Sequence, residues 1–165
     1  MDKRQQTCCF TGHRILPRDM EDELWTKTYA HLQPLLTQGV RYFGVGGALG
    51  FDTLITERLL ELRDIISPIK VILVLPFRSY QSRWTPEQQI RAAKIEARAD
   101  KIVYCSDAPS RNAFLYRDRH LVNGSAYCIC SRGIRTAPRL AFRPKVECSP
   151  LETVFPRCRF FHLLQ

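Results

Sequence analysis

Apolar residues along the first 130 positions follow two alternating patterns, short continuous runs and stretches with helical spacing. The short runs are β-prone and mostly end at glycine, proline or serine, which predicts strands. They lie at residues 6–11, 40–45, 69–75, 101–105 and 126–130. Between them, apolar residues recur at intervals of three and four, which predicts helices. These helices span residues 19–39, 51–66, 86–99 and 111–122. The alternation predicts an α/β protein with a doubly wound, mainly parallel five-stranded sheet.

The pattern stops after residue 130. Prolines at positions 138, 144, 150 and 156 recur every six residues, and neither helix nor strand fits between them. We therefore interpret residues 1–130 as one domain and residues 131–165 as an irregular tail that contains prolines and cysteines. A further hypothesis is that this tail is diverged or read out of frame and replaces a last helix and strand.

The positive charge of the chain is concentrated in the tail. The net charge is +9, but residues 1–130 hold 18 Lys and Arg against 14 Asp and Glu, whereas residues 131–165 hold 7 against 2. The basic tail makes nucleic acid a possible partner. No apolar run approaches the roughly 20 residues of a membrane helix, and the apolar segment after the N-terminus is too short for a signal peptide. We expect a cytoplasmic protein that has no membrane partner.

The seven cysteines predict core packing. No two of them form a CxxC pair, so the sequence indicates neither a metal site nor a redox motif. Most lie within apolar runs, where cysteine behaves as a small buried hydrophobe. Cys8 and Cys9 are neighbours on a predicted strand and should point to opposite faces of the sheet. We expect no metal and no cofactor.

A glycine-rich loop carries the strongest functional signal. In an open parallel sheet, ligands bind beyond the carboxyl ends of the strands. Gly46, Gly47 and Gly50 follow the second predicted strand and precede a helix. Glycines let the backbone approach a phosphate, and the amides at the helix start favour an anion. Asp52 would cap this helix or accept a hydrogen bond from a ligand hydroxyl, and local sequence favours the cap.

Other loops at the same predicted edge add ligand-binding candidates. After the first strand, Thr11, Gly12 and Arg14 offer a hydroxyl, room for close approach and a forked donor for phosphate. His13 would be either an acid/base group or a packing residue. After the third strand, the loop from Pro76 to Trp84 mixes aromatic and basic side chains: Tyr80 and Trp84 could stack on a base, and Arg78 and Arg83 could meet phosphate. On the last predicted helix, Arg117 and Asp118 are either a solvated charged pair or part of the site.

Several nucleotide-site motifs are absent from the sequence. Gly50 is followed by Phe51 and Asp52 rather than Lys and Ser or Thr, which disfavours a P-loop NTPase. The glycines do not form a clean GxGxxG, and no acidic residue closes the second strand, which disfavours a dehydrogenase. No GxSxG nucleophile elbow occurs.

Six segments together resemble the SLOG superfamily, which includes the DprA/Smf and Lonely Guy proteins, and most closely its bacterial YpsA-like branch. They are CCFTGHR at 8–14, GGALGFDTL at 46–54, VLPF at 74–77, Gln81 with Trp84, ARADKIVY at 97–104 and YRDRHLVNGSAYCI at 116–129. The resemblance covers about residues 6–130. It implies a Rossmann-like fold that binds nucleotides or nucleotide-derived, ADP-ribose-like ligands.

The resemblance also implies alternatives. Lonely Guy enzymes cleave the N-glycosidic bond of nucleoside monophosphates, and His13 and Glu57 are weak catalytic candidates for such chemistry. A second glycine motif, which supplies a catalytic glutamate in those enzymes, does not occur after residue 130, and Asp118 stands where the family has Asn. DprA relatives bind single-stranded nucleic acid, for which the basic tail together with Tyr80 and Trp84 would serve. Relatives often pair through helices, so a homodimer is a further expectation.

Overall fold

The computed structural model describes residues 2–66, 68–131 and 158–163. It contains one six-stranded sheet in which all paired strands are parallel, in the order β4-β3-β2-β1-β5-β6. The strands are β1 (Thr7–Thr11), β2 (Tyr42–Val45), β3 (Lys70–Leu75), β4 (Lys101–Tyr104), β5 (Tyr127–Ser131) and β6 (Arg159–Leu163). The α-helices are α1 (Glu21–Thr37), α2 (Phe51–Ile65), α3 (Pro86–Arg98) and α4 (Ala113–Asn123), and 3₁₀ turns occur at Lys3–Gln6 (η1) and Arg18–Met20 (η2). The predicted α/β class and parallel sheet are confirmed.

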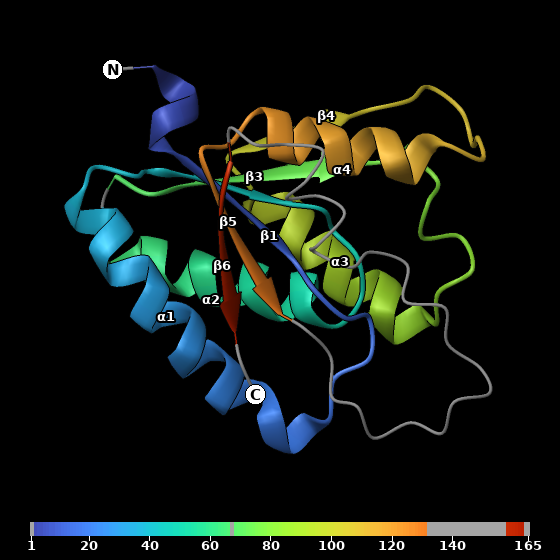
Figure 1. The fold of residues 1–165 in the computed structure, drawn as a ribbon. Coiled ribbons are helices and arrows are strands. Elements are labelled where there is room, and N and C mark those ends of the chain that lie inside the picture. The colour runs from blue at the N-terminus through green and yellow to red at the C-terminus, as the bar shows by residue number, and fades with distance from the viewer. Residues whose placement is uncertain (1, 67, 132–157, 164–165) are drawn as a thin grey trace, which may run out of the picture.

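The strand order explains which helix covers which face. From β1 to β4, each strand is added next to the previous one toward the same edge of the sheet. Right-handed crossovers therefore place α1, α2 and α3 on the same face. The chain then returns past β1 to form β5, and α4 lies on the opposite face. Figure 1 shows α4 on one side of the sheet and α1, α2 and α3 on the other. The strand order reverses between β1 and β5, which is where such folds place ligands.

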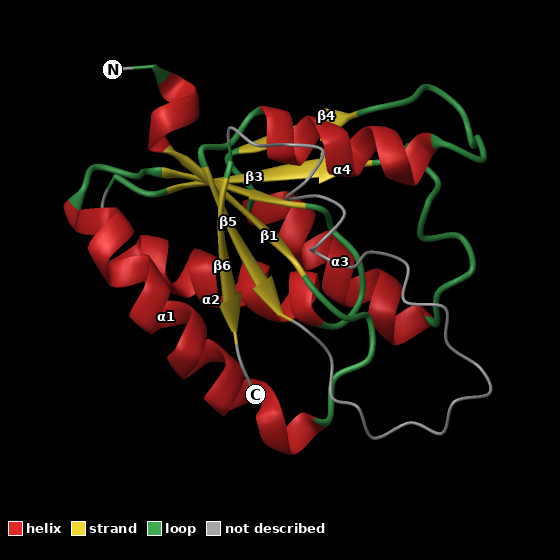
Figure 2. Cartoon of the chain, in the orientation of Figure 1, coloured by secondary structure: helices red, strands yellow, loops and turns green. Residues whose placement is uncertain are grey.

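Two apolar clusters hold the layers together. The larger joins α1, α2 and α3 to the sheet and includes Cys8 and Phe43, both fully buried. The smaller lies under α4 and includes Cys9, Cys128 and Cys130. Cys8 and Cys9 therefore point to opposite faces, and their core-packing role is confirmed. The sheet between these layers is strongly twisted (Figure 2).

Local sequence sets most helix ends within two residues of the prediction. Helix α3 begins with a capping box, in which the Thr85 hydroxyl accepts from the Gln88 amide and the Gln88 side chain accepts from the Thr85 amide. Proline at its first position needs no hydrogen-bond acceptor there. The helix predicted from residue 19 is divided: η2 occupies Arg18–Met20 and α1 begins at Glu21.

The sheet has one strand more than the sequence predicts. Strand β6 pairs with β5 from Tyr127↔Arg159 to Ser131↔Leu163, within the segment expected to be irregular. Pro156 is the last proline, so the apolar run that follows it is free to extend and to donate its amides to a ladder. Residues 132–157, which hold most of the predicted tail, lie outside the described residues.

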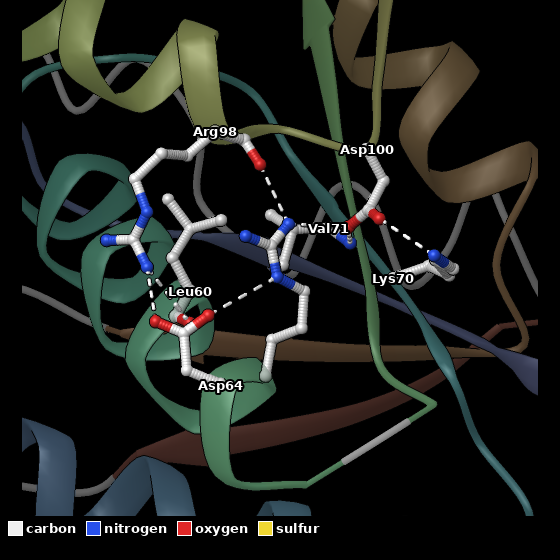
Figure 3. Close-up of polar contacts among 7 residues, drawn as sticks. Leu60, Asp64, Lys70, Val71, Arg98 and Asp100 are labelled. Carbon is white, nitrogen blue, oxygen red and sulfur yellow. Dashed lines mark hydrogen bonds and ion pairs between the residues drawn. The ribbon is translucent and has the colours of Figure 1, made fainter.

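A network of charged side chains closes the amino-terminal ends of β3 and β4. The Asp100 carboxylate accepts from the Val71 amide at 2.9 Å, from Lys70 at 2.9 Å and from Arg63 at 3.0 Å. Arg98 donates to Asp64 at 2.6 Å, which ties α3 to α2 (Figure 3). Burial raises the pKa of Asp100, but these three donors outweigh it and hold the pKa below its ordinary value.

Candidate functional site

The loops after β1 and β2 meet at the carboxyl edge of the sheet. The Phe51 amide donates to the His13 carbonyl oxygen at 2.9 Å. Gly50 has a φ of +77°, and a Cβ there would lie 2.5 Å from the backbone of His13 and Arg14. A Cβ on Gly12 would lie 2.5 Å from the Phe51 ring. Both positions therefore require glycine, because a side chain there would clash with the other loop. The prediction that the two loops lie next to each other is confirmed.

A cavity opens beside this contact, between the glycine loop, the start of α1 and the groove between α2 and α3. Its volume of about 360 Å³ falls within the range of small-molecule sites. Its lining combines backbone, charged and aromatic groups. The main lining residues from the loops are Arg14, Ile15, Leu16, Gly47, Leu49, Gly50, Tyr80 and Trp84, and those from the helices are Glu21, Thr53, Thr56, Gln88, Arg91, Ala92, Ile95 and Glu96.

Part of the glycine turn is already hydrogen-bonded within the protein. The Ala48 amide donates to the Asp52 carboxylate at 3.2 Å, and the Phe51 amide donates to the His13 carbonyl oxygen. Among the described residues, no acceptor is found for the amides of Gly47, Leu49 and Gly50. All three residues line the cavity, so the turn brings amides without a protein acceptor to the wall of the cavity.

Asp52 braces the turn and does not cap the helix. The residue before α2 is Gly50, which has no side chain to cap with. Asp52, in the first turn, is 6% exposed, and its carboxylate reaches back to the Ala48 amide. Burial raises its pKa to about 6, against the opposing charge of Arg117. The local expectation of a helix cap is therefore replaced by a bond that closes the glycine turn.

Arg117 holds the same turn from the other face of the sheet. It extends from α4, is 7% exposed, and donates to the Gly46 carbonyl oxygen at 2.8 Å. It also forms an ion pair with Asp118 at 2.8 Å. Two guanidinium groups lie over the Phe114 ring, that of Arg117 at 5.7 Å and that of Arg14 at 5.5 Å from its centroid, which is the geometry of cation–π contacts. Arg117 and Asp118 thus support the loop, and neither is among the cavity-lining residues.

Arg14 lines the cavity and is also exposed to solvent. Its side chain is exposed, and it forms no ion pair with any described carboxylate. Arg91, also in the lining, differs, because its Nε and Nη2 atoms donate to the two carboxylate oxygens of Glu57, at 2.7 and 2.6 Å. Arg14 is therefore the cation in this lining whose charge is open to an anion.

The aromatic loop after β3 forms another wall. Trp84 and Tyr80 meet edge to face, with ring centroids 5.3 Å apart. The Tyr80 hydroxyl donates to the Gly47 carbonyl oxygen at 3.1 Å, and burial raises the pKa of Tyr80, which keeps this group protonated. Arg78 instead lies over the Tyr104 ring at 4.5 Å, and neither it nor Arg83 is in the lining.

The two weak catalytic candidates lie outside the cavity lining. His13 contributes its backbone carbonyl to the loop contact, and burial lowers the pKa of its imidazole. Both carboxylate oxygens of Glu57 accept hydrogen bonds from Arg91. Of the remaining predicted residues, Thr11 ends β1 opposite Cys130, and Pro76 is buried just after β3.

Sequence reasoning missed several residues that face the cavity. Leu49, Glu21, Arg91 and Glu96 line it, but they lie on three separate segments, the glycine loop, α1 and α3, and share no motif. The spacing of charges along α3 resembles an ordinary solvated face. Only the packing of α3 against α2 turns Arg91 and Glu96 toward the glycine loop.

Two searches of the described residues gave no site of another kind. No helix in this part of the chain has the length and apolarity to cross a bilayer. No group of three or more His, Cys, Asp or Glu side chains among the same residues is arranged to hold a metal ion.

Comparison with known families agrees with the arrangement of the loops. A family model, YpsA, described as the YspA SLOG family, matches residues 25–131, which is more than half of the chain. The chain belongs to the YpsA family of SLOG proteins. The match includes the glycine loop and the α4 residues that support it.

Curated relatives within this family are similar at low identity. A UPF0398 protein of Listeria monocytogenes serotype 4a is 22% identical over 157 residues, which covers 92% of this chain and 86% of that protein. A UPF0398 protein of Macrococcus caseolyticus is 26% identical over 87 residues, covering 53% of this chain and 47% of that protein. Among solved structures, DNA processing protein A from Helicobacter pylori, described for its binding of single-stranded DNA, matches with a TM-score of 0.50 and 16% identity. That match covers 93% of this chain and 74% of that chain, and it shows a shared fold.

Proposed function

We propose that this YpsA-family protein binds a nucleotide or nucleotide-derived ligand in the cavity at the carboxyl edge of its sheet. The observation that carries the proposal is that Gly47, Leu49 and Gly50 line the cavity and that their amides have no acceptor among the described residues. Backbone amides at a helix start and a nearby guanidinium are the donors that phosphate groups bind. Arg14 lines the same cavity and adds the charge.

The remaining walls suit the rest of a nucleotide. Trp84 presents an aromatic surface, and Ile15, Leu16 and Ala92 add apolar surface. A base stacked on an aromatic ring gains about 1 to 3 kcal/mol. A phosphate-bearing molecule with a planar base, such as AMP or ADP-ribose, would use both the donors and this surface.

Thermal-shift and calorimetric titrations with AMP, ADP-ribose, adenosine and inorganic phosphate test the proposal. We expect AMP or ADP-ribose to stabilise the fold, and adenosine to do so much less because it lacks the phosphate. Arg14→Ala should weaken AMP binding by about tenfold or more, because it removes a charge-assisted hydrogen bond. Arg83→Ala removes an exposed arginine outside the cavity and serves as the matched control. Equal binding of AMP and adenosine would contradict the phosphate site.

A second candidate function is binding of single-stranded nucleic acid. The fold similarity to DNA processing protein A of Helicobacter pylori, which binds single-stranded DNA, favours it, and Arg78, Arg83 and Arg111 are exposed on the loops of the same edge. Binding of a labelled oligonucleotide should then weaken steeply with salt. Arg83→Ala should weaken it too, although the same variant leaves AMP binding unchanged. This substitution therefore separates oligonucleotide binding at the loops from AMP binding in the cavity.

Neither weak catalytic candidate favours the hydrolase alternative. His13 and Glu57 are absent from the residues that line the cavity, so neither is placed to act on a ligand there. Incubation with AMP and detection of free adenine tests this directly. Release of adenine would require another acid/base group in the cavity.

A further inference from the structure

The cavity carries hydrogen-bond acceptors as well as donors. Glu21, from the first turn of α1, and Glu96, from α3, line the same cavity as Arg14 and the free amides. Phosphate alone would use the donors and would be repelled by the two carboxylates. A ligand that is anionic at one end and carries hydroxyl groups further along would match both sets.

The Glu96 carboxylate is held in place by a chain of hydrogen bonds. The Gln81 side-chain amide donates to Oε1 of Glu96 at 2.6 Å and to the Tyr80 hydroxyl oxygen at 2.7 Å. The Tyr80 hydroxyl in turn donates to the Gly47 carbonyl oxygen at 3.1 Å. The carboxylate is thus linked through Gln81 and Tyr80 to Gly47, which also lines the cavity, and this fixes its position relative to the glycine turn.

One carboxylate oxygen of Glu96 remains open. Within the described residues, Oε2 accepts no hydrogen bond. A carboxylate whose orientation is fixed by one amide and whose second oxygen is unused is an effective acceptor for hydroxyl groups. Asp52, which the sequence analysis names as an acceptor for a ligand hydroxyl, instead accepts a hydrogen bond from the Ala48 amide. Glu21 accepts no hydrogen bond within the described residues, and its charge acts on Arg91.

We propose that Glu96, oriented by Gln81, accepts hydrogen bonds from the ribose hydroxyls of the ligand, so that the site selects ribonucleotides over 2′-deoxyribonucleotides. This inference rests on the proposed nucleotide site. The juxtaposition of free amides, Arg14 and an oriented carboxylate in one cavity carries it. Loss of the 2′-hydroxyl would leave the half-buried carboxylate without one of its donors.

Calorimetric affinities for AMP and 2′-deoxy-AMP test this selection. We expect 2′-deoxy-AMP to bind the wild-type protein about tenfold or more weakly than AMP, because a hydrogen bond to a charged group is lost. Glu96→Gln should bring the two affinities to within about threefold, chiefly by weakening AMP. Glu23→Gln changes an exposed side chain on α1 outside the cavity and should leave the ratio unchanged.

The outcomes separate this inference from the function on which it rests. Equal affinity of the wild-type protein for the two nucleotides would overturn the ribose selection and leave the nucleotide site standing. Selection that survives Glu96→Gln would overturn the role of Glu96. Absence of binding by AMP, 2′-deoxy-AMP and inorganic phosphate would overturn the nucleotide site itself. Should Glu96→Gln fail to fold, Gln81→Ala, which releases the carboxylate, is expected to reduce the ratio as well.

Discussion

The two ends of the parallel sheet use charge in opposite ways. At the amino-terminal ends of β3 and β4, Asp100, Lys70 and Arg63 are joined to one another and to a backbone amide (Figure 3). At the carboxyl ends, Arg14 has no carboxylate partner among the described residues, and several amides of the glycine turn have no acceptor there. Charged groups that form ion pairs and hydrogen bonds within the protein stabilise the fold, whereas donors without a protein acceptor at a cavity are available to bind a ligand. The contrast predicts where substitutions affect stability and where they affect binding.

The largest effect on stability should come from the loop contact that builds the carboxyl end. Gly50→Ala places a Cβ 2.5 Å from the backbone of His13 and Arg14, at a φ of +77°. We expect a loss of about 4 kcal/mol in the free energy of unfolding, from backbone strain and the clash together. Gly39 has a φ of +93° with no atom within 4 Å of its Cβ position, so Gly39→Ala should cost only about 1 kcal/mol. Similar losses in urea titrations of both variants would refute the close contact.

A pH-dependent effect should appear at the buried brace of the glycine turn. Burial raises the pKa of Asp52 from 3.8 to about 6. Since the folded pKa exceeds the unfolded one, this group favours the fold most below pH 4, and that contribution declines as pH rises through about 6. The free energy of unfolding of the wild-type protein relative to Asp52→Asn should therefore fall by about 3 kcal/mol between pH 4 and pH 7. A constant difference over that range would show that the carboxyl is not desolvated.

A pair of substitutions compares the two ends directly. Asp100→Ala removes three hydrogen bonds at the amino-terminal end and should lower the free energy of unfolding at pH 7 by about 2 kcal/mol. Because the folded pKa of Asp100 is depressed, this advantage of the wild type should begin to decline as the pH falls below about 4 and be lost as the pH falls through the folded pKa.

Arg14→Ala should change the free energy of unfolding by less than about 0.5 kcal/mol, although it weakens AMP binding. Chemical denaturation with and without AMP measures both effects. If Arg14→Ala destabilised the unliganded protein as much as Asp100→Ala, the proposed division between the two ends would be wrong.

The sequence predicts the helices and strands of residues 1–130 because each depends on the pattern of residues close together along the chain. The aliphatic run at β3 has the composition of a strand covered on both faces, and Pro86 is typical of the first turn of a helix, where α3 begins. Strand β6 was missed because only pairing with β5 reveals it. Its apolar residues follow a proline-rich stretch whose texture argued against regular structure.

The sequence predicts only part of the candidate site, because some of its contacts join residues that are far apart along the chain. Gly46, Gly47 and Gly50 stand together in the sequence, and the rule that ligands bind beyond the strand ends placed them at an edge. The sequence shows Arg117 and Asp118 as a charged pair, but the hydrogen bond from Arg117 to Gly46 across the sheet depends on the return of the chain past β1. Asp52 was expected to cap α2, and its actual bond to Ala48 follows from the shape of the turn.

The sequence by itself determined the parallel sheet, the places of its helices and the glycine turn, because hydrophobic periodicity and backbone freedom act between residues close along the chain. Only the tertiary structure decided that Arg14, Glu21 and Glu96 share one cavity and that Glu57 is engaged by Arg91. Those relations join residues far apart in sequence, and they depend on how helices pack across a twisted sheet rather than on any local preference.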